Sequence, residues 1–143
     1  MTLIHDHIHS KNPSAKRVFL KIDRLHLEKR RWRGIAEDGS EFGFDLAHPL
    51  QDGDQFFEND NTLYVIEQLA EAVIEIPIPN EPAAAARVGW LLGNLHFKIE
   101  LLDGFLRIND DLAIRQLLER EHIPHEFKEA AFHPISGGHS HAH

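Results

Sequence analysis

The chain has 143 residues, enough for one domain of average size or two very small ones. It contains no cysteine, which excludes disulfide scaffolds, thiolate zinc sites, iron–sulfur clusters and cysteine nucleophiles. The net charge of −8 with neutral histidine argues against non-specific nucleic-acid binding. No apolar run approaches the roughly 20 residues of a membrane span, and the start lacks a signal-peptide pattern, so we expect a cytoplasmic protein without membrane contact.

Twelve histidines are the most unusual feature of the composition. Imidazole titrates near neutral pH and is the commonest metal ligand when it is neutral, so the positions of these residues matter more than their number. The charge is also uneven. Residues 1–33 hold nine lysines and arginines against three acids, whereas the remaining residues hold six against twenty.

The first half of the chain predicts short strands separated by turns. Asp38-Gly39 is a strong hairpin signal, because both central residues tolerate positive φ. Residues 41–46 alternate with period two, which places Phe42, Phe44 and Leu46 on one face. Further strands are expected at 18–22, 33–36, 55–57 and 63–66, with a second turn at 52–54. The pattern predicts an N-terminal all-β domain over residues 1–69, as a small sandwich or open barrel.

The second half predicts the order βαββαβ, which is the ferredoxin-like arrangement, over residues 70–143. Pro82 suits the first turn of a helix, and Gly93-Asn94 can end that helix in a left-handed cap. Asn109 or Asp110 is expected to cap a second helix. The apolar face of this helix is formed by Leu112, Ile114, Leu117 and Leu118. Strands are expected at 72–76, 97–101, 105–108 and 125–128, with a turn at 103–104. The fold class is therefore α+β, with a flexible histidine-containing tail after Pro134.

The tail carries the strongest signal for metal binding. His139, His141 and His143 alternate with small residues, and three imidazoles on a flexible end can wrap one ion. The alternative is a purification tag, which the interruption of the run makes less favourable. His133 precedes the hinge-like Gly137-Gly138 and could fold back together with the tail.

Other histidines and cations have alternative interpretations. His5, His7 and His9 lie on one side of an extended leader, and a metal-scavenging site and a disordered leader remain equally open. His122 and His125 are interpreted as mainly structural, because Pro124 breaks the helix that would aim both rings at one ion. Two further histidines stand alone and are expected to be surface or strand residues: His26 and His48. The basic stretch 29–33 is interpreted as a strand edge or a partner surface in preference to a nucleic-acid patch.

An ordered set of elements resembles the UreE family of urease accessory nickel metallochaperones, over about residues 16–143. In chain order, the set consists of Arg31-x-Arg33, the Asp38-Gly39 turn, Asp52-Gly53-Asp54, Gly93-Asn94-Leu95-His96 and the histidine tail. The resemblance implies an N-terminal β domain that contacts partner proteins and a C-terminal ferredoxin-like domain that binds metal and dimerises. It also implies that one His96 from each protomer binds nickel. Leu95 stands where the family has arginine, and Asp110 and Leu112 lie where some members carry further histidines.

These observations predict a dimeric nickel metallochaperone that assists urease maturation and is not an enzyme. No phosphate loop, nucleophile elbow or cysteine–histidine pair is present in the sequence. The expected ligands of Ni²⁺, with Zn²⁺ as a competing ion, are His96, His133, His139, His141 and His143. The expected partners are a second copy, with two dimers able to form a tetramer, a urease accessory GTPase and the urease apoprotein. The alternatives are a zinc or nickel storage protein without a delivery role and a nucleic-acid module that uses the basic N-terminal stretch.

Overall fold

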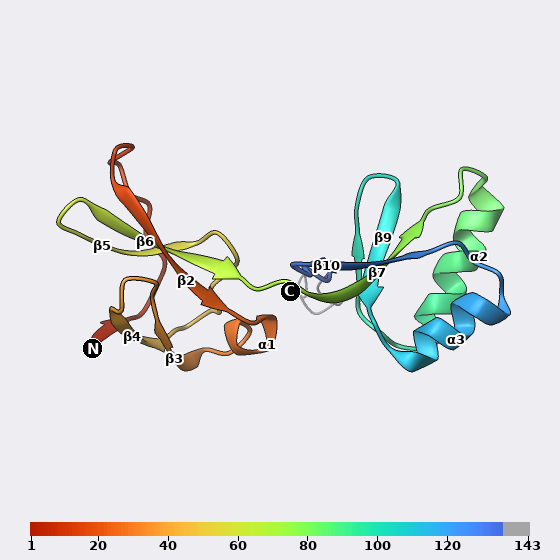
Figure 1. Ribbon diagram of the computed structural model, residues 1–143, viewed down its shortest axis with the longest axis horizontal. Helices are drawn as coiled ribbons and strands as arrows, with labels where there is room; N and C mark the ends of the chain where they lie inside the picture. The colour runs from red at the N-terminus through yellow and green to blue at the C-terminus, as the bar shows by residue number, and fades with distance from the viewer. Residues whose placement is uncertain (136–143) are drawn as a thin grey trace. The chain divides into compact units, whose positions relative to one another are not determined.

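The chain divides into two compact units, Met1–Leu69 and Ala70–His143, and the computed structural model describes residues 1–135 (Figure 1). Each unit has its own hydrophobic core. Among the described residues, no helix is both long and apolar enough to cross a membrane.

The N-terminal unit is built from two three-stranded sheets. One sheet has the order β1-β4-β3, and the other has the order β2-β6-β5. The strand bounds are β1 Thr2–Ile4, β2 Lys16–Ile22, β3 Arg31–Ile35, β4 Glu41–Asp45, β5 Gln55–Asn59 and β6 Thr62–Gln68. The β-rich character of this half is as expected. Strand β1 and the single-turn helix α1 (Arg24–Leu27) were not expected, because each is too short to produce a periodic pattern.

Aromatic and aliphatic side chains form the core of this unit. Phe42, Phe44 and Leu46 are all buried, as the period of two predicts. Trp32 stacks on Phe44 with ring centres 3.9 Å apart, and Phe42 meets Phe56 edge to face at 4.9 Å. These aromatic pairs join residues from both sheets into one core.

Of the two turns expected in this unit, the one at 52–54 is confirmed, because Gly53 has positive φ and the Asp54 amide donates to the Gln51 carbonyl at 3.0 Å. The other turn differs from the expectation in detail. At Asp38-Gly39 only the glycine has positive φ, and the Ala36 amide donates to the Ser40 carbonyl in a longer loop. The two-residue turn with positive φ at both positions lies instead between β5 and β6, at Asp60 and Asn61. Both residue types tolerate the left-handed region, so the expected chemistry is present at a different turn.

The C-terminal unit is one four-stranded antiparallel sheet with the order β10-β7-β9-β8 and two helices. The bounds are β7 Glu71–Pro77, α2 Pro82–Gly93, β8 Ile99–Leu101, β9 Phe105–Asn109, α3 Leu112–Arg120 and β10 Glu126–Ala130. Both helices cover the same face of the sheet (Figure 1), where Ile74, Ile76 and Ile108 pack against the helix residues Leu92 and Leu118. This order and pairing are those of the expected ferredoxin-like arrangement, so the α+β fold class is confirmed.

Two expected details of the helices are wrong. The side chain that caps α3 is Asp111, which accepts from the Ala113 amide at 2.9 Å, and not Asn109 or Asp110. Leu112 is 68% exposed, because it lies at the first helical position and faces away from the core that Ile114 reaches.

Candidate metal centre

His96 lies in a tight turn that follows α2. The turn is closed by two hydrogen bonds, from the Leu95 amide to the Leu92 carbonyl at 3.1 Å and from the His96 amide to the Gly93 carbonyl at 3.0 Å. The sequence predicts a left-handed residue at Gly93-Asn94. In the structure Asn94 has φ of −64°, and the left-handed residue is His96, with φ of 61°. A side chain in this region costs about 1–2 kcal/mol relative to glycine, and such residues are enriched at functional sites.

The neighbours of His96 explain its direction. Leu95 and Phe97 are half-buried and pack against the core of the C-terminal unit. His96 between them is exposed. Two apolar anchors therefore hold the turn to the core and leave the imidazole in solvent. The leucine that replaces the family's arginine thus has a packing role.

His133 lies in a segment that crosses the sheet. This segment, residues 131–135, follows β10 at one edge and reaches β8 at the other edge: the Arg107 guanidinium donates to the Ala131 carbonyl at 3.3 Å, and the Ile135 amide donates to the Ile99 carbonyl at 2.8 Å. It lies on the face opposite the helices, since Arg107 projects there with its cross-strand neighbour Glu75. We call residues 131–135 the crossing segment.

The crossing segment is anchored by side chains as well as by backbone. Phe132 is fully buried, and the His133 amide donates to Glu100 Oε1 at 3.0 Å. The His133 ring lies near the same carboxylate, with Nδ1 3.8 Å from Oε2, and the side chain is 48% exposed. Glu100 is in β8, which begins three residues after His96. The structure therefore brings His133 to the strand that follows the His96 turn.

A part-buried ion-pair network supports this face of the sheet. Arg107 on β9 contacts Glu75 on β7 at 2.8 Å and Glu100 on β8 at 3.3 Å, and these side chains are 13–19% exposed. Both acids are direct cross-strand partners of the arginine. Glu100 is thus held by the guanidinium, and we interpret it as an anchor of the crossing segment and not as a free metal ligand.

The acid that occupies the place of the family's additional histidines is also engaged. Asp110 forms a two-pronged ion pair with Arg115, with both oxygens 2.7 Å from guanidinium nitrogens. The hydrogen bonds from Arg115 lower the pKa of Asp110 below its usual value. Asp110 therefore serves as a structural partner of α3.

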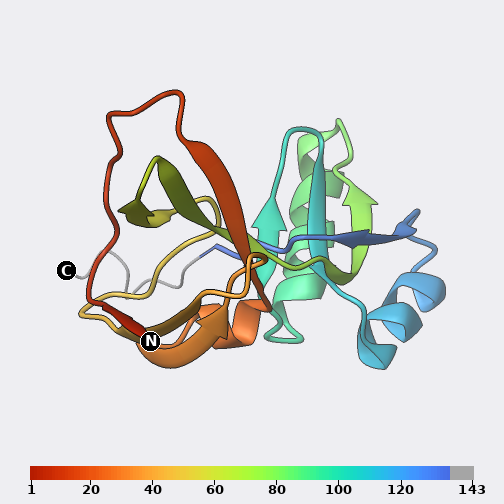
Figure 2. The ribbon, with the colours of Figure 1, turned by 60° about the vertical axis from the view of Figure 1, so that its left-hand side comes forward.

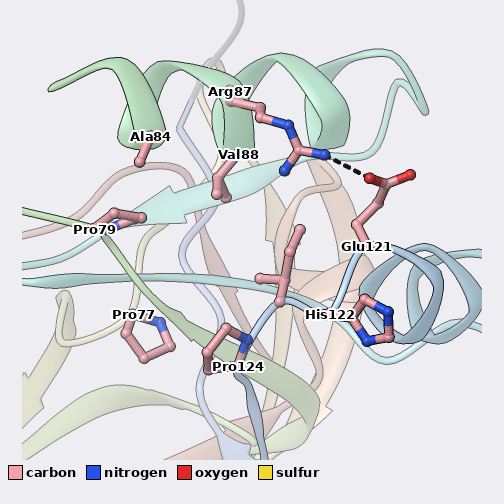
Figure 3. Close-up of a pocket in the computed structure, with 9 residues that line it drawn as sticks. Pro77, Pro79, Ala84, Arg87, Val88, Glu121, His122 and Pro124 are labelled. Carbon is pink, nitrogen blue, oxygen red and sulfur yellow. Dashed lines mark hydrogen bonds and ion pairs between the residues drawn. The ribbon is translucent and has the colours of Figure 1, made fainter. Parts of the chain in front are cut away.

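His122 and His125 have different surroundings in the structure. His125 donates from Nδ1 to the Ile123 carbonyl at 2.8 Å and meets Phe127 edge to face. His122 has φ of 54° and lines a pocket of about 370 Å³ between α2 and the end of α3 (Figure 3). The wall of this pocket is largely proline and aliphatic, and the Arg87–Glu121 ion pair of 2.6 Å spans one side of it.

Other predicted ligands are separate or lie outside the described residues. His139, His141 and His143 belong to residues 136–143, which the structure does not describe. Within residues 1–135, no three histidine or acidic side chains are grouped so that they could hold one ion. Any site that uses His96 or His133 therefore needs ligands from the tail, from a second copy or from water.

Helix α2 carries an exposed surface that sequence reasoning did not single out. Trp90 is 66% exposed, and the small residues Ala83, Ala86 and Gly93 near it on the helix are exposed as well. Spacings of three and four residues put all four on one side of the helix. A large exposed tryptophan among small residues is typical of a surface that packs against another molecule.

The fold and the site define a class of protein: a two-domain α+β protein with an exposed histidine turn beside a ferredoxin-like sheet. The model of the UreE urease accessory protein, C-terminal domain, matches residues 71–143. The chain therefore belongs to the UreE family of urease accessory proteins.

Similarity to individual proteins extends over most of the chain. It is 31% identical over 121 residues to the urease accessory protein UreE of Cupriavidus necator, covering 80% of this chain and 62% of that protein. It is 32% identical over 130 residues to the UreE of Beijerinckia indica, covering 90% and 73%. It is 30% identical over 135 residues to the UreE of Bacillus sp. (strain TB-90), covering 90% and 88%. The chain thus spans less than two thirds of the Cupriavidus protein and most of the Bacillus protein.

Proposed function

We propose that this protein is a nickel metallochaperone that binds Ni²⁺ at a dimer-interface histidine site and delivers it for urease maturation in the cytoplasm. The observation that carries the proposal is the outward presentation of His96 in a left-handed turn between the half-buried anchors Leu95 and Phe97. Family membership supports the urease-related role.

A second copy of the chain would supply the second imidazole. In a two-fold symmetric dimer the same residue from each protomer lies near the axis, so one exposed histidine per chain becomes a pair. The α2 surface around Trp90 supports this arrangement, because His96 follows the tryptophan by only six residues. Burial of Trp90 against its copy would remove apolar area from water and bring the two turns together.

The crossing segment supports a role for the tail histidines. The His133 amide bonds to the Glu100 side chain, and the Ile135 amide bonds to the Ile99 carbonyl. The crossing segment therefore runs antiparallel to β8, toward the residues that precede β8. From Ile135, the four residues to His139 can span up to roughly 14 Å. The three residues from Ile99 back to His96 cover about 10 Å at most. The tail is therefore long enough to bring imidazoles to His96.

Such a site would bind nickel through nitrogen and stay open. Imidazole suits Ni²⁺, and Zn²⁺ would compete for the same ligands. Transfer to an accessory GTPase and then to the urease apoprotein would be stepwise ligand exchange, in which one imidazole replaces another. Because protons compete for the same nitrogens, binding should weaken below about pH 6.

Urease activation at limiting nickel tests the delivery role. We expect cells that carry His96→Ala to form little active urease at low nickel and to recover when nickel is raised. His26→Ala is the matched control, because His26 is also exposed and is paired with Asp23 on α1. Unchanged activation in His96→Ala at every nickel level would contradict delivery through His96.

A further inference from the structure

The leader histidines lie in a defined conformation in the N-terminal unit, outside the proposed nickel site. The segment between β1 and β2 runs beside β5, as the red trace in Figure 2 shows. The Ile8 amide donates to the Gln55 carbonyl at 2.8 Å, and the Ser10 amide donates to Gln55 Oε1 at 2.8 Å. Two hydrogen bonds to one residue of β5 thus hold the chain on either side of His9.

This pairing places two imidazoles together. Ile8 is half-buried toward the unit, whereas His7 and His9 on either side of it are exposed. Their ring centres are 5.1 Å apart and their planes are nearly perpendicular, at 83°. With a metal–nitrogen bond of about 2.1 Å, the centre of each imidazole ring lies ~3.2 Å from a bound ion. For the angles of about 90–110° between adjacent ligands, the two ring centres are then roughly 4.6–5.3 Å apart. The observed separation falls in this range without any rearrangement of the backbone.

Asp6 orients one of the two rings. Its Oδ1 accepts from the His7 amide at 2.8 Å and lies 2.9 Å from His7 Nδ1. A carboxylate that accepts the Nδ1 proton leaves the Nε2 lone pair free, which is the arrangement that supports histidine ligands in metal sites. His5 is held apart from the pair by a hydrogen bond of 3.0 Å from its Nδ1 to the Asp45 carbonyl at the end of β4.

We propose that His7 and His9 form a second, open binding site for a divalent transition metal, with Asp6 as a positioning residue. No third histidine or acidic ligand is grouped with the pair in the described residues, so water completes the coordination. Two nitrogen ligands and several waters give weak binding and fast exchange. The affinity should follow the general order for nitrogen sites, with Cu²⁺ above Ni²⁺.

The site is tested in a full-length chain whose other candidate ligands are replaced, with His96, His133, His139, His141 and His143 all changed to alanine. Nickel chloride is titrated while the imidazole resonances are followed by NMR. We expect the signals of His7 and His9 to broaden first and one weak ion to bind per chain. Adding His7→Ala and His9→Ala should abolish this ion, and Asp6→Asn should weaken it by about 10- to 100-fold.

His26→Ala and His48→Ala are the controls, because both histidines are exposed and neither belongs to the pair. Persistence of the ion after loss of His7 and His9 would overturn the proposal. Broadening that begins at His26 or His48 would also overturn it. Circular dichroism checks that each variant is folded. Because His96 is absent throughout, the result does not depend on the proposed delivery site.

Discussion

The backbone amide of Ile135 donates a 2.8 Å hydrogen bond to the carbonyl of Ile99, at the start of the edge strand β8. This bond joins the last described residue of the chain to the strand that follows the His96 turn. The histidine tail continues from this point. A metal site built from His96 and the tail is therefore compatible with the fold, although the two elements are about 40 residues apart in sequence.

The left-handed backbone at His96 predicts that two substitutions differ in stability and have the same effect on metal binding. Because φ is 61°, His96→Gly should be more stable than His96→Ala by about 1–2 kcal/mol. Both variants should lose tight nickel binding. Urea unfolding measures the difference in stability, and equal stability of the two variants would contradict the turn geometry.

Leu95 should stabilise the C-terminal unit through packing. We expect Leu95→Ala to lower the free energy of unfolding by about 1–2 kcal/mol, because a half-buried leucine loses part of its contact with the core. Leu112→Ala is the matched control, since this leucine is 68% exposed and its loss should change stability by less than about 0.5 kcal/mol. Equal effects of the two substitutions would show that Leu95 does not anchor the turn.

Arg107 should be essential for the sheet face that holds the crossing segment. Arg107→Ala leaves Glu75 and Glu100 part-buried without their shared cation, and we expect a loss of about 3–5 kcal/mol. Adding Glu75→Gln and Glu100→Gln should recover much of this loss, because the unpaired charges are then removed. Thermal unfolding of the single and triple variants gives the comparison, and absence of any recovery would argue against an electrostatic cause.

Acid should destabilise the N-terminal unit through Asp38. The Ser40 amide and the Tyr64 hydroxyl donate to this carboxylate and lower its pKa below the usual value. A carboxylate whose pKa is lowered by folding stabilises the folded state at pH values above its unfolded pKa of about 3.9. This stabilisation is lost as the pH falls through the pKa of the folded state.

The pH effect can be isolated with one substitution. Urea midpoints are followed by Trp32 fluorescence in a Trp90→Phe chain, because Trp32 is buried in the N-terminal unit. We expect the midpoint to fall as the pH drops below about 4, and to fall less in Asp38→Asn. The same slope in both chains would contradict a contribution from Asp38.

Much of the fold was predictable because local signals were strong. Pro82 at a helix start, Gly104 in the turn between β8 and β9, and the alternation of Phe42, Phe44 and Leu46 all have the expected places. The misses are short-range details. The exposure of Leu112 depends on the direction in which α3 leaves its cap, and helical spacing alone does not give that direction.

The candidate site was only partly predictable. His96 follows from the resemblance, but its left-handed backbone and the anchoring role of Leu95 appear only when the helix end is packed against the core. The link between His133 and β8 needs the crossing segment, which joins opposite edges of the sheet. No local pattern encodes a contact between residues so distant in the chain. The pairing of His7 and His9 likewise depends on Gln55 of β5.

Native mass spectrometry with added nickel tests the central claim most directly. Wild-type protein should appear as a dimer that retains one tightly bound Ni²⁺ shared by the two chains. His96→Ala should remain a dimer, since Trp90 is unchanged, and should lose this ion. A wild-type dimer with one equally tight ion in each chain, or a His96→Ala dimer that keeps the shared ion, would contradict the proposed site.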